Sequence, residues 1–232
     1  MTEKLLNENL KHINEKIEKC CYEFGRKPSE ITLLAATKTV PPEIVNQAIS
    51  LGVSCIGENR VQELLHKMDK LNLKNCNLHF IGRLQKNKVK QIVDKVSLIH
   101  SVDSLDLAKE ISKASVKKNV NSDILIQINI GREKSKGGIY DEALEDLLYN
   151  IKELANVKVR GLMAIPPICE NEIESEKFFY SMQKLFIDIR DKNIDNINMD
   201  YLSMGMSNDY CQAIKFGANI IRIGSAIFGA RD

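Results

Sequence analysis

The chain alternates between short, nearly continuous apolar runs and longer stretches whose apolar residues recur at helical spacing. Runs such as 31–37 (ITLLAAT) and 123–130 (DILIQINI) have the composition of strands that are buried on both faces. Strands are predicted at 31–37, 53–57, 78–82, 97–102, 123–130, 157–165, 199–205 and 219–224. Helices are predicted between them at 41–52, 59–71, 87–95, 105–118, 140–155, 173–191 and 207–217.

This alternation predicts the fold class. Strands that alternate with helices form a parallel sheet, and eight such units in a chain of this length favour a closed (β/α)8 barrel. The alternative is a doubly wound open sheet, but the glycine-rich G-x-G-x-x-G turn typical of that fold is absent. No Gly/Ser-rich linker interrupts the pattern, so residues 1–232 are expected to form a single domain.

The N-terminal segment, residues 1–25, is predicted to form an additional helix. Its apolar residues recur near helical spacing from Leu5 to Ile17, and Gly25 follows as a stop signal. Only FGARD follows the region of the eighth strand, so no outer helix is expected there. We therefore expect the N-terminal helix to pack on the barrel over its last strands, in place of that missing helix.

The composition and net charge favour an ordinary globular protein over a nucleic-acid or membrane binder. The 232 residues are 44% hydrophobic and 28% charged, an ordinary globular balance. Lys and Arg total 33 and Asp and Glu total 31, so the net charge is 33 − 31 = +2, which argues against a nucleic-acid coat or a polybasic membrane binder. No apolar run approaches the roughly 18 residues that span a bilayer, and the N-terminus is charged throughout. A cytoplasmic protein is expected.

Cysteine and histidine positions indicate no metal site. No C-x-x-C pair occurs, so the cysteines fit neither a zinc site nor a secreted disulfide framework, and most are expected to be small core residues in a reducing compartment. The histidines show no i, i+4 pair. The cysteines are Cys20, Cys21, Cys55, Cys76, Cys169 and Cys211, and the histidines are His12, His66, His79 and His100.

Lys38 is the first candidate functional residue, because it closes an apolar strand and would sit at the mouth of a barrel. Partial burial lowers the pKa of a lysine, and a neutral amine can attack a carbonyl to form a Schiff base. The alternative is a strand-end lysine whose ammonium group extends into water.

The last two strands suggest an anion site. Ser207 is expected at the start of a helix after a Gly-containing turn, and Gly224 and Ser225 follow the eighth strand; the loops after strands seven and eight commonly bind phosphate in this fold. The alternatives are that Ser207 is only a helix cap and Gly224 only a turn residue. Arg222 lies in an apolar strand, where a buried guanidinium needs a ligand or a structural ion pair.

A lysine, a phosphate cradle and a strand-borne arginine together describe a site for pyridoxal 5′-phosphate (PLP). The segments that carry a family resemblance are LLAATKTVPPEIVNQAI, GENRVQEL, LHFIGRLQKNK, GLMAIPP and LSMGMSNDYCQAIKFGANIIRIGSAIFG. They resemble those of the pyridoxal phosphate homeostasis protein family, which is similar to the N-terminal barrel of alanine racemase. The resemblance runs from about Ile31 to Asp232.

The resemblance implies a role for each site residue. Lys38 forms the Schiff base, Arg222 faces the pyridine nitrogen, and phosphate is held by Ser207, Gly224 and Ser225. Three further residues line the ring pocket: Asn59, Met163 and Ser203. Ser225 replaces a common threonine and keeps its hydroxyl. Arg83 and Lys86 depart from the family pattern and receive no role.

Three functions remain to be weighed. The first is a PLP carrier without turnover, expected to be a monomer, that buffers the cofactor or delivers it to PLP-dependent apo-enzymes. The second is an amino-acid racemase, which the chain disfavours because it ends at the barrel and has Pro42 where the racemase segment has a tyrosine. The third is a nucleic-acid binder using Arg83, Lys86, Lys88, Lys90 and Lys95, a run that is more typical of a solvated helix face.

Overall fold

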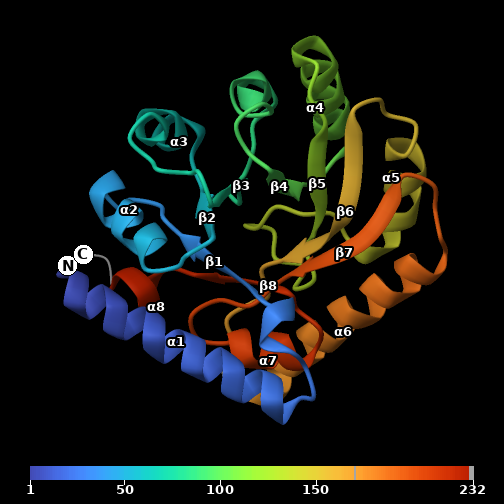
Figure 1. Cartoon of the computed structure of the whole chain (residues 1–232). Coiled ribbons are helices and arrows are strands. Elements are labelled where there is room, and N and C mark those ends of the chain that lie inside the picture. Colours follow the sequence, from blue (N-terminus) through green and yellow to red (C-terminus); the bar gives the residue numbers. More distant parts are fainter. Residues whose placement is uncertain (170, 230–232) are drawn as a thin grey trace.

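Eight parallel strands form a closed barrel in the computed structural model, which describes residues 1–169 and 171–229 (Figure 1). Each strand pairs with the next in the chain, and β8 pairs with β1. The strands are β1 (Thr32–Ala36), β2 (Cys55–Glu58), β3 (Asn77–Phe80), β4 (Leu98–Val102), β5 (Ser122–Ile128), β6 (Val157–Ala164), β7 (Ile197–Ser203) and β8 (Ile220–Ile223). The predicted (β/α)8 barrel is confirmed.

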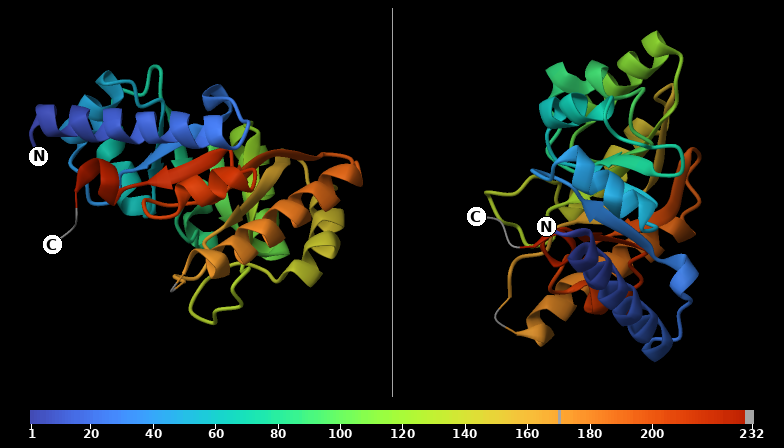
Figure 2. Two further views of the ribbon diagram at one scale, coloured as in Figure 1. Left: turned by 90° about the horizontal axis from the view of Figure 1, so that it is seen from below. Right: turned by 60° about the vertical axis from the view of Figure 1, so that its left-hand side comes forward.

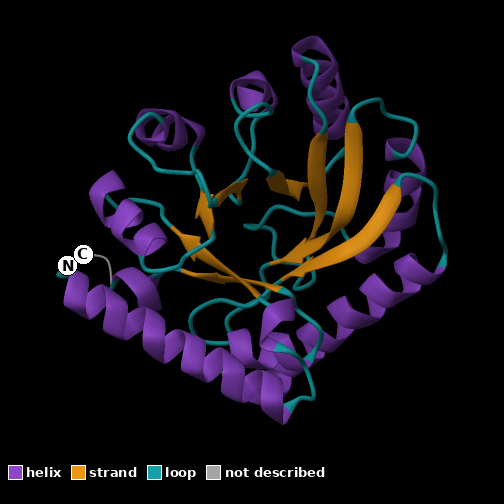
Figure 3. Cartoon of the chain, viewed as in Figure 1, coloured by secondary structure: helices purple, strands orange, loops and turns teal. Residues whose placement is uncertain are grey.

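Helices surround the barrel and cover its outer face (Figure 3). The α-helices after the strands are α2 (Pro42–Ser50), α3 (Val61–Met68), α4 (Leu105–Lys118), α5 (Leu144–Ile151), α6 (Glu172–Asp191), α7 (Tyr210–Lys215) and α8 (Ser225–Phe228). Short 3₁₀ helices are η1 (Pro28–Glu30), η2 (Lys86–Gln91) and η3 (Asp141–Ala143). The helix predicted at 87–95 is therefore a 3₁₀ turn. None of the described helices is long and apolar enough to cross a membrane.

Two apolar layers hold the barrel together. The larger lies between the sheet and its helices. A smaller cluster fills the inside of the barrel, because successive side chains of a strand point to opposite faces. Its members are Leu34, Cys55, Ile81, Leu98, Leu125, Met163 and Ile220. The inside of the barrel is thus a packed core, and polar side chains within it need bonded partners.

The N-terminal helix α1 (Glu3–Glu23) packs against α7 and α8, the last two helices of the chain (Figure 2). Its buried face includes Leu6 and Ile13. The side chain of Arg26, just after α1, donates hydrogen bonds to the backbone oxygens of Ile214 (3.1 Å) and Ala218 (2.5 Å). α1 thus packs on the outer helices α7 and α8. The expectation that no outer helix follows β8 is wrong, because α8 is present there, but α8 has only four residues.

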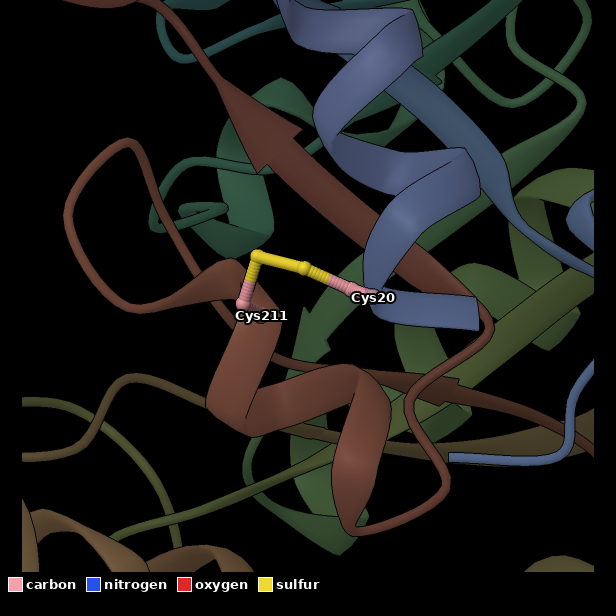
Figure 4. Close-up of a disulfide and its surroundings, with 2 residues drawn as sticks. All are labelled: Cys20 and Cys211. Atoms are coloured by element: carbon pink, nitrogen blue, oxygen red, sulfur yellow. A yellow bond between two sulfur atoms is a disulfide. The ribbon is translucent and has the colours of Figure 1, made fainter. Parts of the chain in front are cut away.

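A disulfide bond joins Cys20 of α1 to Cys211 of α7 (Figure 4). The expectation of cysteines that are small core residues in a reducing compartment is wrong for this pair. The partners are 191 positions apart in the sequence, and only the packing of α1 on α7 brings them together. Among the free cysteines, Cys21, Cys55 and Cys76 are buried as predicted, and Cys169 is partly exposed.

Candidate functional site

The predicted site residues come from the carboxyl ends of five strands. Lys38 follows β1 and Asn59 follows β2, while Met163 and Ser203 lie at or next to the ends of β6 and β7. Arg222 lies within β8. Parallel strands in a closed barrel direct these ends to one face, where the sites of this fold lie. The structure thus gathers at one mouth residues that are widely separated in the sequence.

The backbone around Lys38 is tightly held on both sides. Thr37 is buried, and its hydroxyl donates to the Glu58 carboxylate over 2.7 Å. Thr39 has a φ of 64°, a left-handed conformation that is strained for a β-branched residue. Its N–H donates to the Glu63 carboxylate over 2.5 Å. Strain of this kind persists where the surroundings enforce it, so the turn that carries Lys38 is rigidly defined.

A buried lysine on α3 joins these contacts into one cluster. The Lys67 amine donates to the carboxylates of Glu58 (2.9 Å) and Glu63 (2.6 Å) and to the backbone oxygen of Thr37 (2.8 Å). Lys67 is only 5% exposed and Glu58 is fully buried. Burial raises the pKa of Glu58, and its hydrogen bonds to Thr37 and Lys67 act in the opposite direction. The sequence shows the i, i+4 spacing of Glu63 and Lys67 but gives no sign that the pair is buried, so this cluster is not among the predicted site residues.

Arg222 is a buried cation inside the barrel. One terminal nitrogen donates to Ser203 Oγ over 2.7 Å and the other to the backbone oxygen of Ala164 over 2.8 Å. Burial lowers the pKa of Arg222 to about 10, so the guanidinium is still charged at neutral pH. Among the described residues no carboxylate lies within ion-pair distance of it, although the charge of Asp209 still acts to raise the pKa of Arg222. Its remaining N–H groups can meet an acceptor on a ligand.

Two serine hydroxyls meet where the loops after β7 and β8 come together. Ser225 Oγ donates to Ser207 Oγ over 3.1 Å, and Ser207 Oγ also accepts the N–H of Ala226 over 3.4 Å. The expected helix start at Ser207 is wrong, because α7 begins only at Tyr210. Ser207 instead lies in the turn before it. Gly224 occupies the capping position of α8 without a side-chain cap.

The turn after β7 needs the glycine at position 205. Gly205 has a φ of +92°, and a Cβ there would lie 2.6 Å from the Cβ of Ala213 on α7. The Asp209 carboxylate closes the same turn by accepting the N–H of Met206 over 2.5 Å. The close approach of α7 to this turn thus depends on the glycine at position 205. The turn in turn fixes the position of Ser207, which lies between Gly205 and the start of α7.

Asn59 adds a polar group with no partner. Its Oδ1 atom is buried and lacks a hydrogen bond within the described parts of the chain. Asn59 also lines a cavity of about 320 Å³ together with Arg60, Arg83 and Lys88. A buried amide oxygen normally has a donor, so this position is suited to a ligand that supplies one.

A larger cavity, of about 660 Å³, lies on the outside of the barrel. It is lined by residues of α1, α6 and α7, among them Cys20 and Cys211, and by none of the predicted site residues. Because it lies among the outer helices, it is separate from the mouth that carries Lys38 and Arg222.

The comparisons with known proteins agree with this geometry. Residues 26–232 match the family model described as alanine racemase, N-terminal domain. A protein of Aquifex aeolicus named pyridoxal phosphate homeostasis protein is 45% identical over 97% of this chain and 97% of its own. An Escherichia coli protein of the same name is 37% identical over 97% of this chain and 96% of its own.

Solved structures extend the similarity to three dimensions. The structure of PipY from Synechococcus elongatus with PLP bound is 28% identical, covers 97% of this chain and 100% of PipY, and has a TM-score of 0.84. An alanine racemase of Clostridium difficile is 13% identical, with a TM-score of 0.79 over 98% of this chain and 57% of the racemase. At that identity the likeness concerns the fold alone.

Proposed function

We propose, from the premise that the chain belongs to the pyridoxal phosphate homeostasis protein family, that it binds PLP and serves the intracellular homeostasis of this cofactor. The single observation that carries this proposal is Arg222, a buried guanidinium whose hydrogen bonds within the described residues go to Ser203 and the backbone oxygen of Ala164 and to no carboxylate. A buried cation of this kind is suited to an acceptor on a bound ligand.

The residues at the mouth fit the ring nitrogen, the phosphate and the aldehyde of PLP. The ring nitrogen is an acceptor for which Arg222 has free N–H groups, and the phosphate is suited to the hydroxyls of Ser207 and Ser225 beside Gly224. Asn59 has an Oδ1 atom without a hydrogen-bond partner among the described residues. Met163 and Ser203 are buried and would line the pocket around the ring. Lys38 supplies the amine that the aldehyde needs.

When bound, the cofactor supplies an aldehyde that a lysine amine converts into a Schiff base with loss of one water. The protein's part is to hold and orient. The cluster around Lys67 fixes the backbone of Lys38, and the serines bind phosphate. Arg222 donates to the ring nitrogen and keeps it unprotonated, which makes the ring a weaker sink for electrons.

We further propose that the protein holds PLP without turnover and buffers it or passes it to PLP-dependent apo-enzymes. The weak electron sink beside Arg222 supports this, and so does Pro42 at the first residue of α2, where the racemase segment has a tyrosine. A monomeric state and a location in the cytoplasm remain predictions from the sequence.

The test of binding uses purified protein and PLP. We expect added PLP to give a visible absorption band that borohydride removes, with the reduced cofactor attached to Lys38 in a peptide digest. Lys38→Ala should lose the label, whereas Lys70→Ala, an exposed lysine near the end of α3, should keep it. An unchanged wild-type spectrum, or a label on another residue, would contradict the proposal.

The racemase alternative has its own test. The PLP-loaded protein is incubated with L- or D-amino acids, and optical rotation is followed over time. We expect no rate above that of free PLP. Sustained turnover by the wild-type protein that is lost in Lys38→Ala would establish the racemase instead.

A further inference from the structure

A chain of hydrogen-bonded side chains crosses the inside of the barrel and ends on Arg222. His79 Nδ1 lies 3.0 Å from His100 Nε2, and His100 Nδ1 lies 3.0 Å from Ser203 Oγ. Ser203 accepts the bond from Arg222, and Cys55 Sγ lies 3.6 Å from His79 Nδ1 at the other end. All five residues are buried. They come from five different strands, and the function proposed above uses only Arg222 and Ser203.

The direction of the hydrogen bonds follows from counting protons. Arginine has no acceptor, so Ser203 Oγ must accept from Arg222. The described residues offer the Ser203 hydroxyl hydrogen no acceptor other than His100 Nδ1. A buried hydroxyl hydrogen without an acceptor is unfavourable, so Ser203 donates to His100.

The same count fixes both histidine tautomers. Because His100 Nδ1 accepts, the hydrogen of the neutral ring is on Nε2 and is donated to His79 Nδ1. His79 therefore also carries its hydrogen on Nε2. Burial lowers the pKa of His79 to about 4 and that of His100 well below its usual range, so both rings are neutral at physiological pH. The hydrogens that link Arg222, Ser203, His100 and His79 then all point away from Arg222, and the Cys55 thiol makes only a weaker sulfur contact with His79 Nδ1.

We propose that His100 is a positioning residue for Arg222, acting through Ser203, with His79 as the group that holds His100 in the required tautomer. By accepting the Ser203 hydrogen, His100 keeps the lone pairs of Ser203 turned to the guanidinium. The planar guanidinium is thereby fixed at two points, Ser203 Oγ and the Ala164 oxygen. A group that is already oriented binds its ligand with a smaller loss of entropy.

The functional part of this inference depends on PLP being the ligand, but the tautomers can be measured without it. Nitrogen-15 NMR of the histidine side chains in the ligand-free protein at neutral pH should show His79 and His100 protonated on Nε2 alone. The exposed His12 and His66 give reference signals. A hydrogen on Nδ1 of His100, or a doubly protonated ring, would overturn the proposal whether or not PLP binds.

The second experiment measures PLP affinity by absorbance in three variants. His100→Leu removes the acceptor and should weaken affinity by about two- to tenfold, the loss typical of a hydrogen bond between neutral groups. His100→Asn places its oxygen near the position of Nδ1 and should recover most of that loss. The matched control is Ser101→Ala, because Ser101 is a buried neighbour on β4 whose hydroxyl has no partner among the described residues.

The outcomes are separable. Equal losses in His100→Leu and His100→Asn, or affinity unchanged in both, would contradict a positioning role. If His100→Leu does not fold, Ser203→Ala replaces it, because that change breaks the same link next to Arg222. Failure of the wild-type protein to bind PLP would refute the proposed function, while the NMR result would still decide the direction of the hydrogen bonds.

Discussion

The side-chain amine of Lys67 lies 2.8 Å from the backbone oxygen of Thr37, so a buried cation is bonded directly to the peptide that precedes Lys38. The same amine pairs with Glu58 and Glu63, and Glu63 in turn accepts the N–H of Thr39. One cluster therefore holds the backbone on both sides of Lys38. This relationship couples the stability of the barrel to the position of Lys38.

The first prediction concerns the loss of that cation. Lys67→Met leaves the fully buried Glu58 carboxylate without its partner, and breaking a buried ion pair in this way typically lowers the free energy of unfolding by about 3–5 kcal/mol. Urea denaturation measures the loss, and PLP titration should show weaker binding because Lys38 is less well held. The matched control is Lys70→Met, which changes an exposed lysine.

A triple variant, Lys67→Met with Glu58→Gln and Glu63→Gln, separates the two effects. Removing all three charges should restore much of the stability, because no buried charge is left unpaired. PLP affinity should stay low, since the bond to the Thr37 oxygen is still missing. Recovery of both properties together would show that the cluster acts on stability alone.

The second prediction concerns the disulfide between α1 and α7. Thiol titration of the purified, denatured and unreduced protein should count four free thiols, because two of the six cysteines are paired. A bond between positions 191 apart greatly restricts the unfolded chain, and the chain-entropy model gives a stabilisation of about 5 kcal/mol. Cys20→Ser should therefore lower the melting temperature, whereas Cys169→Ser should not. Six reactive thiols would contradict the bond.

The third prediction is a pH dependence of stability. The pKa of His79 falls to about 4 and that of His100 falls well below its usual range, chiefly through burial. In the unfolded chain both have a pKa of about 6.5. Below that pH the unfolded state binds protons that the folded state does not. Stability is therefore fully present above the unfolded pKa and is lost as the pH falls, by up to about 1.4 kcal/mol per pH unit for each histidine.

Urea denaturation of the wild-type protein between about pH 7 and pH 5, a window that spans the unfolded histidine pKa, measures this slope. The raised pKa values of Glu58 and Asp209 act in the opposite direction. Glu58 and Asp209 are present in both the wild-type protein and the double variant His79→Gln/His100→Asn, so their contributions cancel when the two slopes are compared. The variant should lose most of the slope, and equal slopes in the two proteins would show that the histidines do not contribute.

The fourth prediction concerns α1. Deletion of residues 1–25 exposes the apolar surface that Leu6, Leu10, Ile13 and Ile17 bury, and it also removes one partner of the disulfide. Exposed apolar surface of this kind leads to aggregation. Size-exclusion chromatography and thermal unfolding of the truncated protein measure the outcome. A soluble truncation with one cooperative transition would show that α1 is dispensable for the barrel.

The sequence predicted the helices and strands well where the evidence was local. The helix at 105–118 has the predicted bounds, and the Ser104 side chain caps it by accepting the N–H of Leu107. The end of the chain was predicted less well. Ser207 was expected at a helix start, but the turn closed by Asp209 delays α7 to Tyr210. A turn that is closed by the Asp209 side chain gives no periodic signal in the sequence, so it could not be distinguished there from the first turn of a helix.

The sequence by itself determined the barrel, the strand ends that carry Lys38 and Arg222, and the family resemblance, because hydrophobic periodicity and motifs are properties of neighbouring residues. The tertiary structure alone decided which distant groups meet. The Cys20–Cys211 bond, the burial of Lys67 against Glu58, and the path from His79 to Arg222 each join separate elements. Such pairs depend on how helices and strands pack. The residues next to each partner in the sequence do not indicate a hydrogen bond or disulfide to a distant element, so these contacts could not be predicted from local patterns.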